Sequence, residues 1–275
     1  MYFPVNRSRS PSPATRSASR GGLLLWFGAF LGAAIAVVLW MPAAWLTGLV
    51  GNATQGRLVL DDARGTVWSG SARLLLTGGE GSRDAATLPG RLEWVLRPVW
   101  LGVNLELRLP CCASEALQLA VSPQQGGAQV VVGPANLRLP MGLLSGLGTP
   151  WNTVQLQGAL TLNTTGMDLQ WDKGRMTPKG QLRLEAADVA SRLSTLRPLG
   201  SYRMDLDAAG AGVPPSLKLD TLNGSLLLSG QGQWTDGRLH FKGEASAVPG
   251  REAALANLLN IIGRRNGLRS VITVG

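Results

Sequence analysis

The sequence predicts an all-β protein with a minor helical content. We expect an N-terminal transmembrane helix, then a large, strongly bent antiparallel sheet or incomplete barrel, and one amphipathic helix near the C-terminus. Two patterns support this prediction. No ionisable side chain occurs between Arg20 and Arg57, and beyond this gap apolar and polar residues alternate in short runs. The 36 glycines and 16 prolines supply turn residues between many short strands.

The uncharged segment predicts a transmembrane helix over residues 21–47. About 20 apolar residues in a helix span the hydrocarbon core of a bilayer. A cleavable signal peptide is the alternative, but its apolar region runs only about 7–15 residues and ends at a small-x-small site. The stretch Met41 to Trp45 is a poor cleavage site, which favours a retained anchor. Trp26, Trp40 and Trp45 suit the aromatic belts at the membrane interfaces, although Trp40 could equally pack within the helix.

Charges on the two sides of the segment predict its orientation. The residues ahead of it include four arginines and no acid, and positive residues favour the cytoplasmic side. We therefore expect residues 1–20 to form a disordered cytoplasmic tail, because they show no apolar period. Residues 48–275 would form one β-rich domain on the other side of the membrane.

The downstream alternation predicts the individual strands, because a period of two places one face on a core and the other in water. Successive hairpins favour an antiparallel sheet. The expected strands cover residues 56–60, 66–68, 72–76, 91–96, 103–109, 154–157, 160–162, 167–171, 181–184, 217–219, 226–228, 238–242 and 270–274.

Two segments interrupt this pattern and predict helices. Residues 187–196 fit a short helix with Val189, Leu193 and Leu196 on one side. Residues 252–262 fit a better one, since apolar side chains recur there at helical spacing, with Pro249-Gly250 before it and Gly263 after it.

The charge distribution argues against nucleic-acid binding. Four of the 26 basic residues lie in the acid-free tail, so the rest of the chain carries 22 against 17 acidic residues. The basic residues, Arg91 among them, are scattered singly along the expected strands, which favours a solvated face over a clustered binding surface.

Catalytic constellations are also missing from the sequence. The one histidine, His240, alternates with apolar neighbours and is expected to be exposed on its strand. Asp205 and Asp207 share a strand face, where solvated charges are the simplest interpretation. We expect no metal, no cofactor and no enzymatic activity.

Cys111 and Cys112 are adjacent, and a vicinal disulfide is rare, so two thiols or an intermolecular bridge are the simpler expectations.

A set of ordered motifs beyond Arg20 resembles the protein N family of the type II secretion system. The motifs are the Met-Pro-Ala-Ala-Trp that ends the apolar segment, Gly65 to Ala72 (GTVWSGSA), Gly90 to Pro98 (GRLEWVLRP), Leu199 to Arg203 (LGSYR) and Pro249 to Arg265. The motif positions that we take as structural candidates are Gly65, Thr66, Trp68, Gly70, Trp94, Pro98, Tyr202, Gly250, Asn257, Asn260 and Gly263.

The resemblance implies a non-enzymatic, single-pass subunit of the bacterial inner membrane with a periplasmic domain, which supports the export of folded proteins by protein–protein contacts. Its implied partners are other secretion subunits, in the inner-membrane platform or the outer-membrane channel. The family also looks distantly similar to AsmA-like proteins, so a lipid-binding groove is the alternative. The Cys111–Cys112 pair departs from the family pattern.

Within these motifs, glycines and tryptophans have physical explanations. Gly65 and Gly70 bracket an expected short strand where a tight turn or close backbone approach excludes a side chain. Trp68 and Trp94 are expected to fill the core or the concave face of the sheet. Core packing is also expected for most of the other strand tryptophans, at positions 100, 151, 171 and 234.

Overall fold

The structure is a computed structural model that describes residues 20–172, 175–210, 212–235 and 238–275. The chain divides into two compact units, Met1–Trp40 and Met41–Gly275. The first unit contains helix α1 (Arg20–Leu39). The second contains the remaining helices, α2 (Ala44–Ala53), η1 (Met141–Leu147), α3 (Trp151–Val154) and α4 (Glu252–Ile262). It also contains the strands β1 (Leu58–Gly65), β2 (Ser69–Thr77), β3 (Ala85–Thr87), β4 (Leu92–Val99), β5 (Gly102–Arg108), β6 (Leu117–Gln124), β7 (Gly127–Val132), β8 (Ala135–Pro140), β9 (Gln157–Asp172), β10 (Arg175–Ala190), β11 (Gly200–Ala209), β12 (Ser216–Gly224), β13 (Leu226–Thr235), β14 (Arg238–Ala247), β15 (Arg264–Asn266) and β16 (Arg269–Val274).

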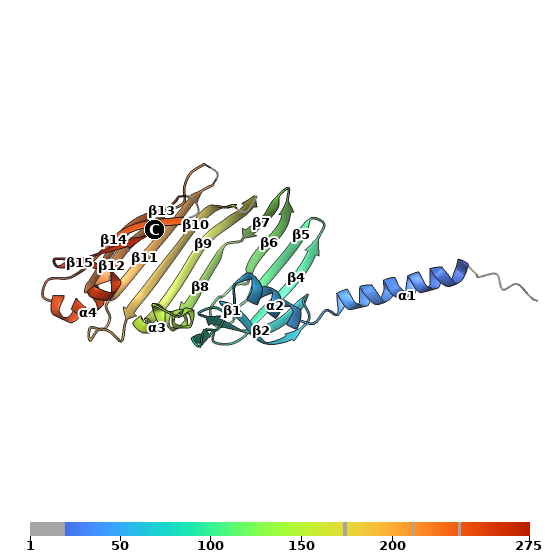
Figure 1. Ribbon diagram of the computed structural model, residues 1–275, viewed down its shortest axis with the longest axis horizontal. Helices are drawn as coiled ribbons and strands as arrows, with labels where there is room; N and C mark the ends of the chain where they lie inside the picture. The colour runs from blue at the N-terminus through green and yellow to red at the C-terminus, as the bar shows by residue number, and fades with distance from the viewer. Residues whose placement is uncertain (1–19, 173–174, 211, 236–237) are drawn as a thin grey trace, which may run out of the picture. The chain divides into compact units, whose positions relative to one another are not determined.

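All the strands that the described residues form belong to one antiparallel sheet of 16 strands, in which most neighbours in space are also neighbours in sequence (Figure 1). The order runs from β1 at one edge to β15 at the other, with β3 beside β2 and β8 beside β9. Because this path ends at two different edge strands, the sheet is open. The predicted large antiparallel sheet is confirmed.

The strand register divides the sheet into an apolar and a polar face. Leu96 on β4 pairs with Leu105 on β5, Leu105 with Leu119 on β6, and Leu119 with Val132 on β7. The same row continues to Met167 on β9. Charged and amide side chains alternate with these residues and point to the opposite face. The alternation of apolar and polar residues in the sequence therefore indicates a sheet with one solvated face.

Helices cover two parts of the apolar face and create two separate cores. Leu46 and Val50 of α2 pack on a first core around Leu60, Leu92 and Trp94. Three leucines of α4, at positions 255, 258 and 259, are buried in a second core with residues of β11, β13 and β14. The helix predicted over residues 252–262 is confirmed with these bounds.

The short helix predicted over residues 187–196 is wrong. Strand β10 continues to Ala190 through a bulge at Asp188, whose φ is 51°, and Val189 pairs with Gly200 on β11. The backbone therefore uses its hydrogen bonds in the sheet, and the apolar residues that suggested a helix pack in the second core. Pairing with distant strands has overridden the local pattern.

Two of the expected short strands are also wrong. Residues 66–68 form the turn between β1 and β2, where Thr66 N–H donates to the Ser69 carbonyl at 2.8 Å and the Ser69 N–H donates to the Thr66 hydroxyl at 3.1 Å. Val154 ends helix α3, and Gln155 has a positive φ of 46° that stops β9 from beginning before Gln157.

Among the residues that the structure describes, no helix combines the length and apolar content needed to cross a membrane. The predicted disordered tail, residues 1–20, lies outside the described residues except for Arg20, where α1 begins. The predicted boundary between residues 47 and 48 falls within α2.

Candidate functional site

The motif around Gly65 and Gly70 closes the hairpin between β1 and β2. These glycines pair with each other, and Gly65 has a φ of 89° that favours glycine. A Cβ on Gly70 would lie 2.5 Å from both the Arg64 carbonyl oxygen and the Trp94 ring. The turn and its tryptophan therefore form one packed unit, not the short strand expected from the sequence.

Trp94 is buried at the centre of the first core. Its indole N–H donates to the carbonyl oxygens of Val67, at 3.1 Å, and Thr66, at 3.3 Å. The indole ring thus packs against the turn and also donates hydrogen bonds to its carbonyl groups. Trp94 packs this turn against the first core, and nearby Trp68 is half-buried.

Arg91 links two strands next to this turn. Its guanidinium donates to the Asp62 carboxylate at 2.8 Å, to the Asp62 carbonyl at 2.6 Å and to the Ser71 hydroxyl at 3.1 Å. Asp62 occupies a bulge of β1 with a φ of 48° and also accepts from Arg64. These two arginines lower the pKa of the Asp62 carboxyl, Arg64 having the larger effect. Arg91 is half-buried and bonded to Asp62 and Ser71, so the expectation that it belongs to a solvated face is wrong. The sequence does not show this contact, because it depends on how distant strands pair.

The C-terminal motifs surround the second core. Tyr202 is buried, and its hydroxyl donates to the Leu226 carbonyl at 3.0 Å. Burial raises the pKa of this phenol. Asn257 and Asn260 lie on the exposed side of α4, while Gly250 and Gly263 flank this helix. Pro98 is exposed near the end of β4.

The tryptophans differ more in burial than the sequence predicts. Trp171 and Trp234 are half-buried on the apolar face of their strands, but they belong to neither of the two cores. Trp100 and Trp151 are exposed, so the expectation of core packing is wrong for them. Trp100 lies in the β4–β5 loop and Trp151 begins the short helix α3, which places both outside the sheet ladder.

The polar face carries ion pairs between neighbouring strands. Arg183 donates to the Asp205 carboxylate at 2.7 Å, which raises the pKa of the guanidinium, and Gln181 donates to Asp207 at 3.1 Å. A hollow of about 800 Å³ is lined in part by these residues. His240 is exposed on β14, as predicted. Within the described ranges, no group of three or more histidine, cysteine or acidic side chains could hold a metal ion.

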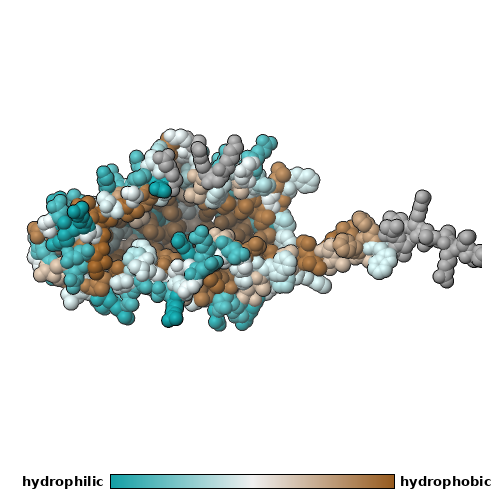
Figure 2. Space-filling view, viewed as in Figure 1, coloured by the Kyte–Doolittle hydropathy of each residue, from teal (hydrophilic) through white to brown (hydrophobic). Residues whose placement is uncertain are grey.

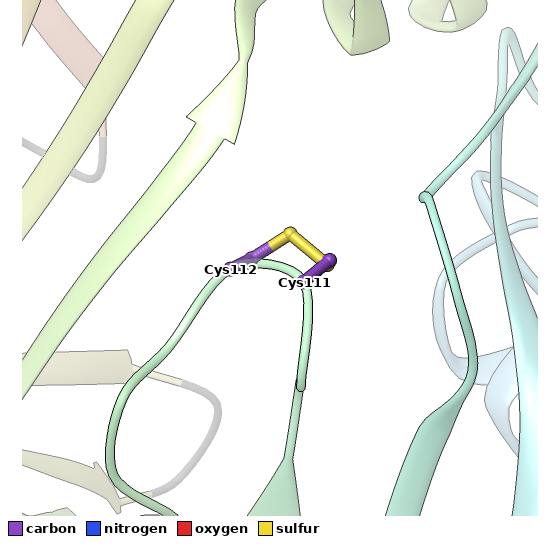
Figure 3. Close-up of a disulfide and its surroundings, with 2 residues drawn as sticks. All are labelled: Cys111 and Cys112. Carbon is purple, nitrogen blue, oxygen red and sulfur yellow. A yellow bond between two sulfur atoms is a disulfide. The ribbon is translucent and has the colours of Figure 1, made fainter.

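Cys111 and Cys112 form a disulfide with each other in the connection between β5 and β6 (Figure 3). Cys112 is buried in the first core, and Cys111 is exposed. The Arg138 N–H donates to the Cys112 carbonyl at 2.7 Å, which holds this connection against β8. The expectation of free thiols or an intermolecular bridge is therefore wrong. Sequence alone could not supply the local backbone geometry on which a vicinal bond depends.

Between the two cores the apolar face of the sheet is only half-buried. Leu169, Leu182, Met204 and Leu206 lie on this face and retain part of their accessible surface. Figure 2 shows hydrophobic residues gathered in a hollow of this face, with hydrophilic residues along its sides. The arrangement provides an extended apolar surface.

A comparison with protein families identifies the chain. A family model described as type II secretion system, protein N, matches residues 56–271. No curated protein and no solved structure is similar enough to this chain to count as a match. The matched region runs from just before β1 to within β16 and includes the strands that form both cores. The chain therefore belongs to the type II secretion system protein N family.

Proposed function

We propose that the protein is a non-enzymatic, single-pass subunit of the inner membrane, whose β-domain lies in the periplasm and supports export of folded proteins through contacts with other secretion subunits. Membership of the protein N family is the observation that carries this proposal. The open sheet adds a physical basis, because edge strands can recruit an extended segment of another protein.

Membrane attachment in this proposal rests on the segment that precedes the sheet. No ionisable residue occurs between Arg20 and Arg57, and arginines without acids precede the gap. Within the first unit, large apolar side chains of α1 such as Phe30 and Ile35 are exposed. A bilayer would remove this surface from water. The positive flank favours a cytoplasmic N-terminus.

The two sheet edges differ in what they offer a partner. At β1, the Thr77 N–H donates to the Arg57 carbonyl, so these two residues form a hydrogen-bonded pair. Antiparallel pairs alternate, so the backbone groups of the next residue, Leu58, point away from β2. The Thr54 hydroxyl contacts both backbone groups of Leu58, at 3.1 and 3.3 Å, which protects this end of the edge.

The opposite edge, β15, presents three exposed residues, of which Arg264 and Arg265 are basic. Its short length limits unspecific pairing. Its charge favours an extended partner segment that contains acidic side chains. We therefore propose β15 as the preferred edge for a secretion subunit.

Photo-crosslinking in secreting cells tests this proposal. A crosslinking amino acid at Arg265 on the β15 edge is expected to capture another secretion subunit. The same amino acid at Gln231, which is exposed on interior strand β13, is the matched control and is expected to capture much less. Equal capture at both positions would contradict edge docking. Normal secretion by a deletion strain, with no crosslinks to secretion subunits, would contradict the proposed function itself.

A second candidate function is the binding of lipid along the apolar face. The half-buried residues between the two cores favour it, because a soluble domain rarely leaves such an extended apolar surface uncovered. Acyl chains would cover this surface without requiring any polar partner.

Native mass spectrometry of the purified protein tests this second function. Leu182→Trp adds bulk to the apolar face, whereas Arg183→Trp adds it to the polar face at the next residue. Bound phospholipid is expected in the parent and in Arg183→Trp, and it is expected to decrease in Leu182→Trp. A parent protein without bound lipid would contradict the candidate.

A further inference from the structure

The loop between β4 and β5 exposes an apolar surface where polar residues would be expected. Val99 pairs with Gly102, which leaves Trp100 and Leu101 as a two-residue loop. Trp100 is 97% exposed, Leu101 is 70% exposed and Val99 is 48% exposed. Tight hairpin loops usually contain Asn, Asp or Gly, so neither loop residue is explained by the turn itself.

The sheet holds this hairpin in a fixed position. Val103 pairs with Val121 on β6, and a Cβ on Gly102 would collide with the Val121 carbonyl. The apolar tip is therefore displayed by a rigid element, not by a long loop.

Helix α2 exposes a second apolar surface. Its inner side chains Leu46 and Val50 pack on the first core, while on the outside Trp45 is 59% exposed and Leu49 is 64% exposed. The helix contains no charged residue. A surface helix normally places polar side chains on its solvent side, so α2 is suited to an apolar neighbour on both sides.

Both surfaces lie close to the point where the second unit begins. The Val67 N–H donates to the Met41 carbonyl at 2.9 Å, which fixes Met41 at the β1–β2 turn. In the same turn, the Trp68 carbonyl accepts from the Leu96 N–H at 2.7 Å. Trp100 follows Leu96 by four residues, so at a strand rise of about 3.3 Å per residue the tip extends roughly 13 Å beyond this point.

We propose that the β4–β5 tip (Val99, Trp100 and Leu101) and the outer side of α2 (Trp45 and Leu49) contact the surface of the lipid bilayer. The inference rests on the proposed membrane attachment. If helix α1, which ends at Leu39, is embedded, Met41 lies at the membrane surface, because it follows the helix by two residues and adjacent Cα atoms are 3.8 Å apart. Tryptophan favours the interface, and exposed Arg97 on the hairpin suits anionic head groups.

Fluorescence of the full-length chain in vesicles of phosphatidylethanolamine and phosphatidylglycerol tests this contact. An environment-sensitive dye is attached at Leu101→Cys, in a chain whose own cysteines are bonded to each other. Its emission is expected to shift to the blue and to be quenched by spin-labelled lipid. The dye at Gln125→Cys, in the exposed polar loop between β6 and β7, is the matched control and is expected to remain water-like.

A third label, at Ile35→Cys within α1, separates this inference from the proposed attachment. Quenching at residue 35 without quenching at residue 101 would overturn the tip contact and leave the anchor intact. Quenching at neither residue would overturn both. A dye at residue 101 that is shielded only when other secretion subunits are added would also overturn the bilayer contact, in favour of a protein partner. Val99→Cys provides a second label position if Leu101→Cys unfolds the domain.

Discussion

At the scale of single residues, the motif glycine and tryptophan of the first core are explained by close packing around Trp94. Gly70 leaves room for the indole ring, and the indole N–H satisfies carbonyl groups of the turn that Gly70 helps to close. The role of Gly70 and Trp94 is to fix the first hairpin of the sheet against its core.

Replacing Gly70 with alanine tests this packing. The new methyl group would collide with the Trp94 ring and the Arg64 carbonyl, so we expect a loss of about 1–3 kcal/mol in the free energy of unfolding. Chemical denaturation of the purified protein measures it. Gly142→Ala is the control, because a Cβ at that position meets nothing within 4 Å. Equal stability of the two variants would contradict the packing account.

The Asp62 carboxylate gives a prediction about pH. Its pKa is lowered by Arg64 and Arg91, so its stabilising contribution is complete above the ordinary aspartate pKa and is lost as the pH falls through the lowered value. We expect Asp62→Asn to melt at a lower temperature than the parent at neutral pH. The difference should shrink once the pH falls below about 4.

Asparagine suits this comparison because it tolerates the positive φ of residue 62. Melting temperatures of parent and variant, recorded across the acidic range, measure the difference between them. A difference that stayed constant down to the lowest pH would show that the contacts with the two arginines are not responsible.

At the scale of elements, α4 is held by leucines whose side chains are buried almost completely. We expect Leu258→Ala to destabilise the domain by about 2–5 kcal/mol, because truncation leaves a cavity in the second core. Asn257→Ala, on the exposed side of the same helix, should change stability by less than about 0.5 kcal/mol. Thermal unfolding distinguishes the two, and a similar cost for both would show that α4 is not packed as described.

Sequence patterns predict these elements where burial alone decides the structure. The period of two across β4, β5 and β10 reflects an apolar and a polar face, and the spacing of leucines in α4 reflects a single buried side. Both signals are local. They required no knowledge of which strands pair.

The features that the sequence does not predict depend on distant contacts or on special backbone geometry. Residues 187–190 extend a strand because β9 and β11 pair with them, and Arg91 finds its partners on β1 and β2. The Cys111–Cys112 bond depends on the shape of one connection. The exposed tip at Trp100 was missed because an aromatic residue beside a strand usually packs in a core.

At the scale of the whole molecule, the second unit is one open sheet with an apolar face that two small cores cover only in part. This architecture provides edges and surfaces for contact. It accords with membership of a secretion-system family. It also accords with the proposed role, in which the sheet contacts other secretion subunits in the periplasm.

The central claim is therefore that the β-domain lies in the periplasm, attached to the inner membrane by the segment that precedes it. Protease treatment of spheroplasts tests this claim, with an epitope added after Gly275 and a cytoplasmic protein followed as the control for lysis. The account predicts that the epitope-bearing domain is digested while the cytoplasmic control stays intact. An epitope that is lost only after the cells are lysed would place the domain in the cytoplasm and contradict the account.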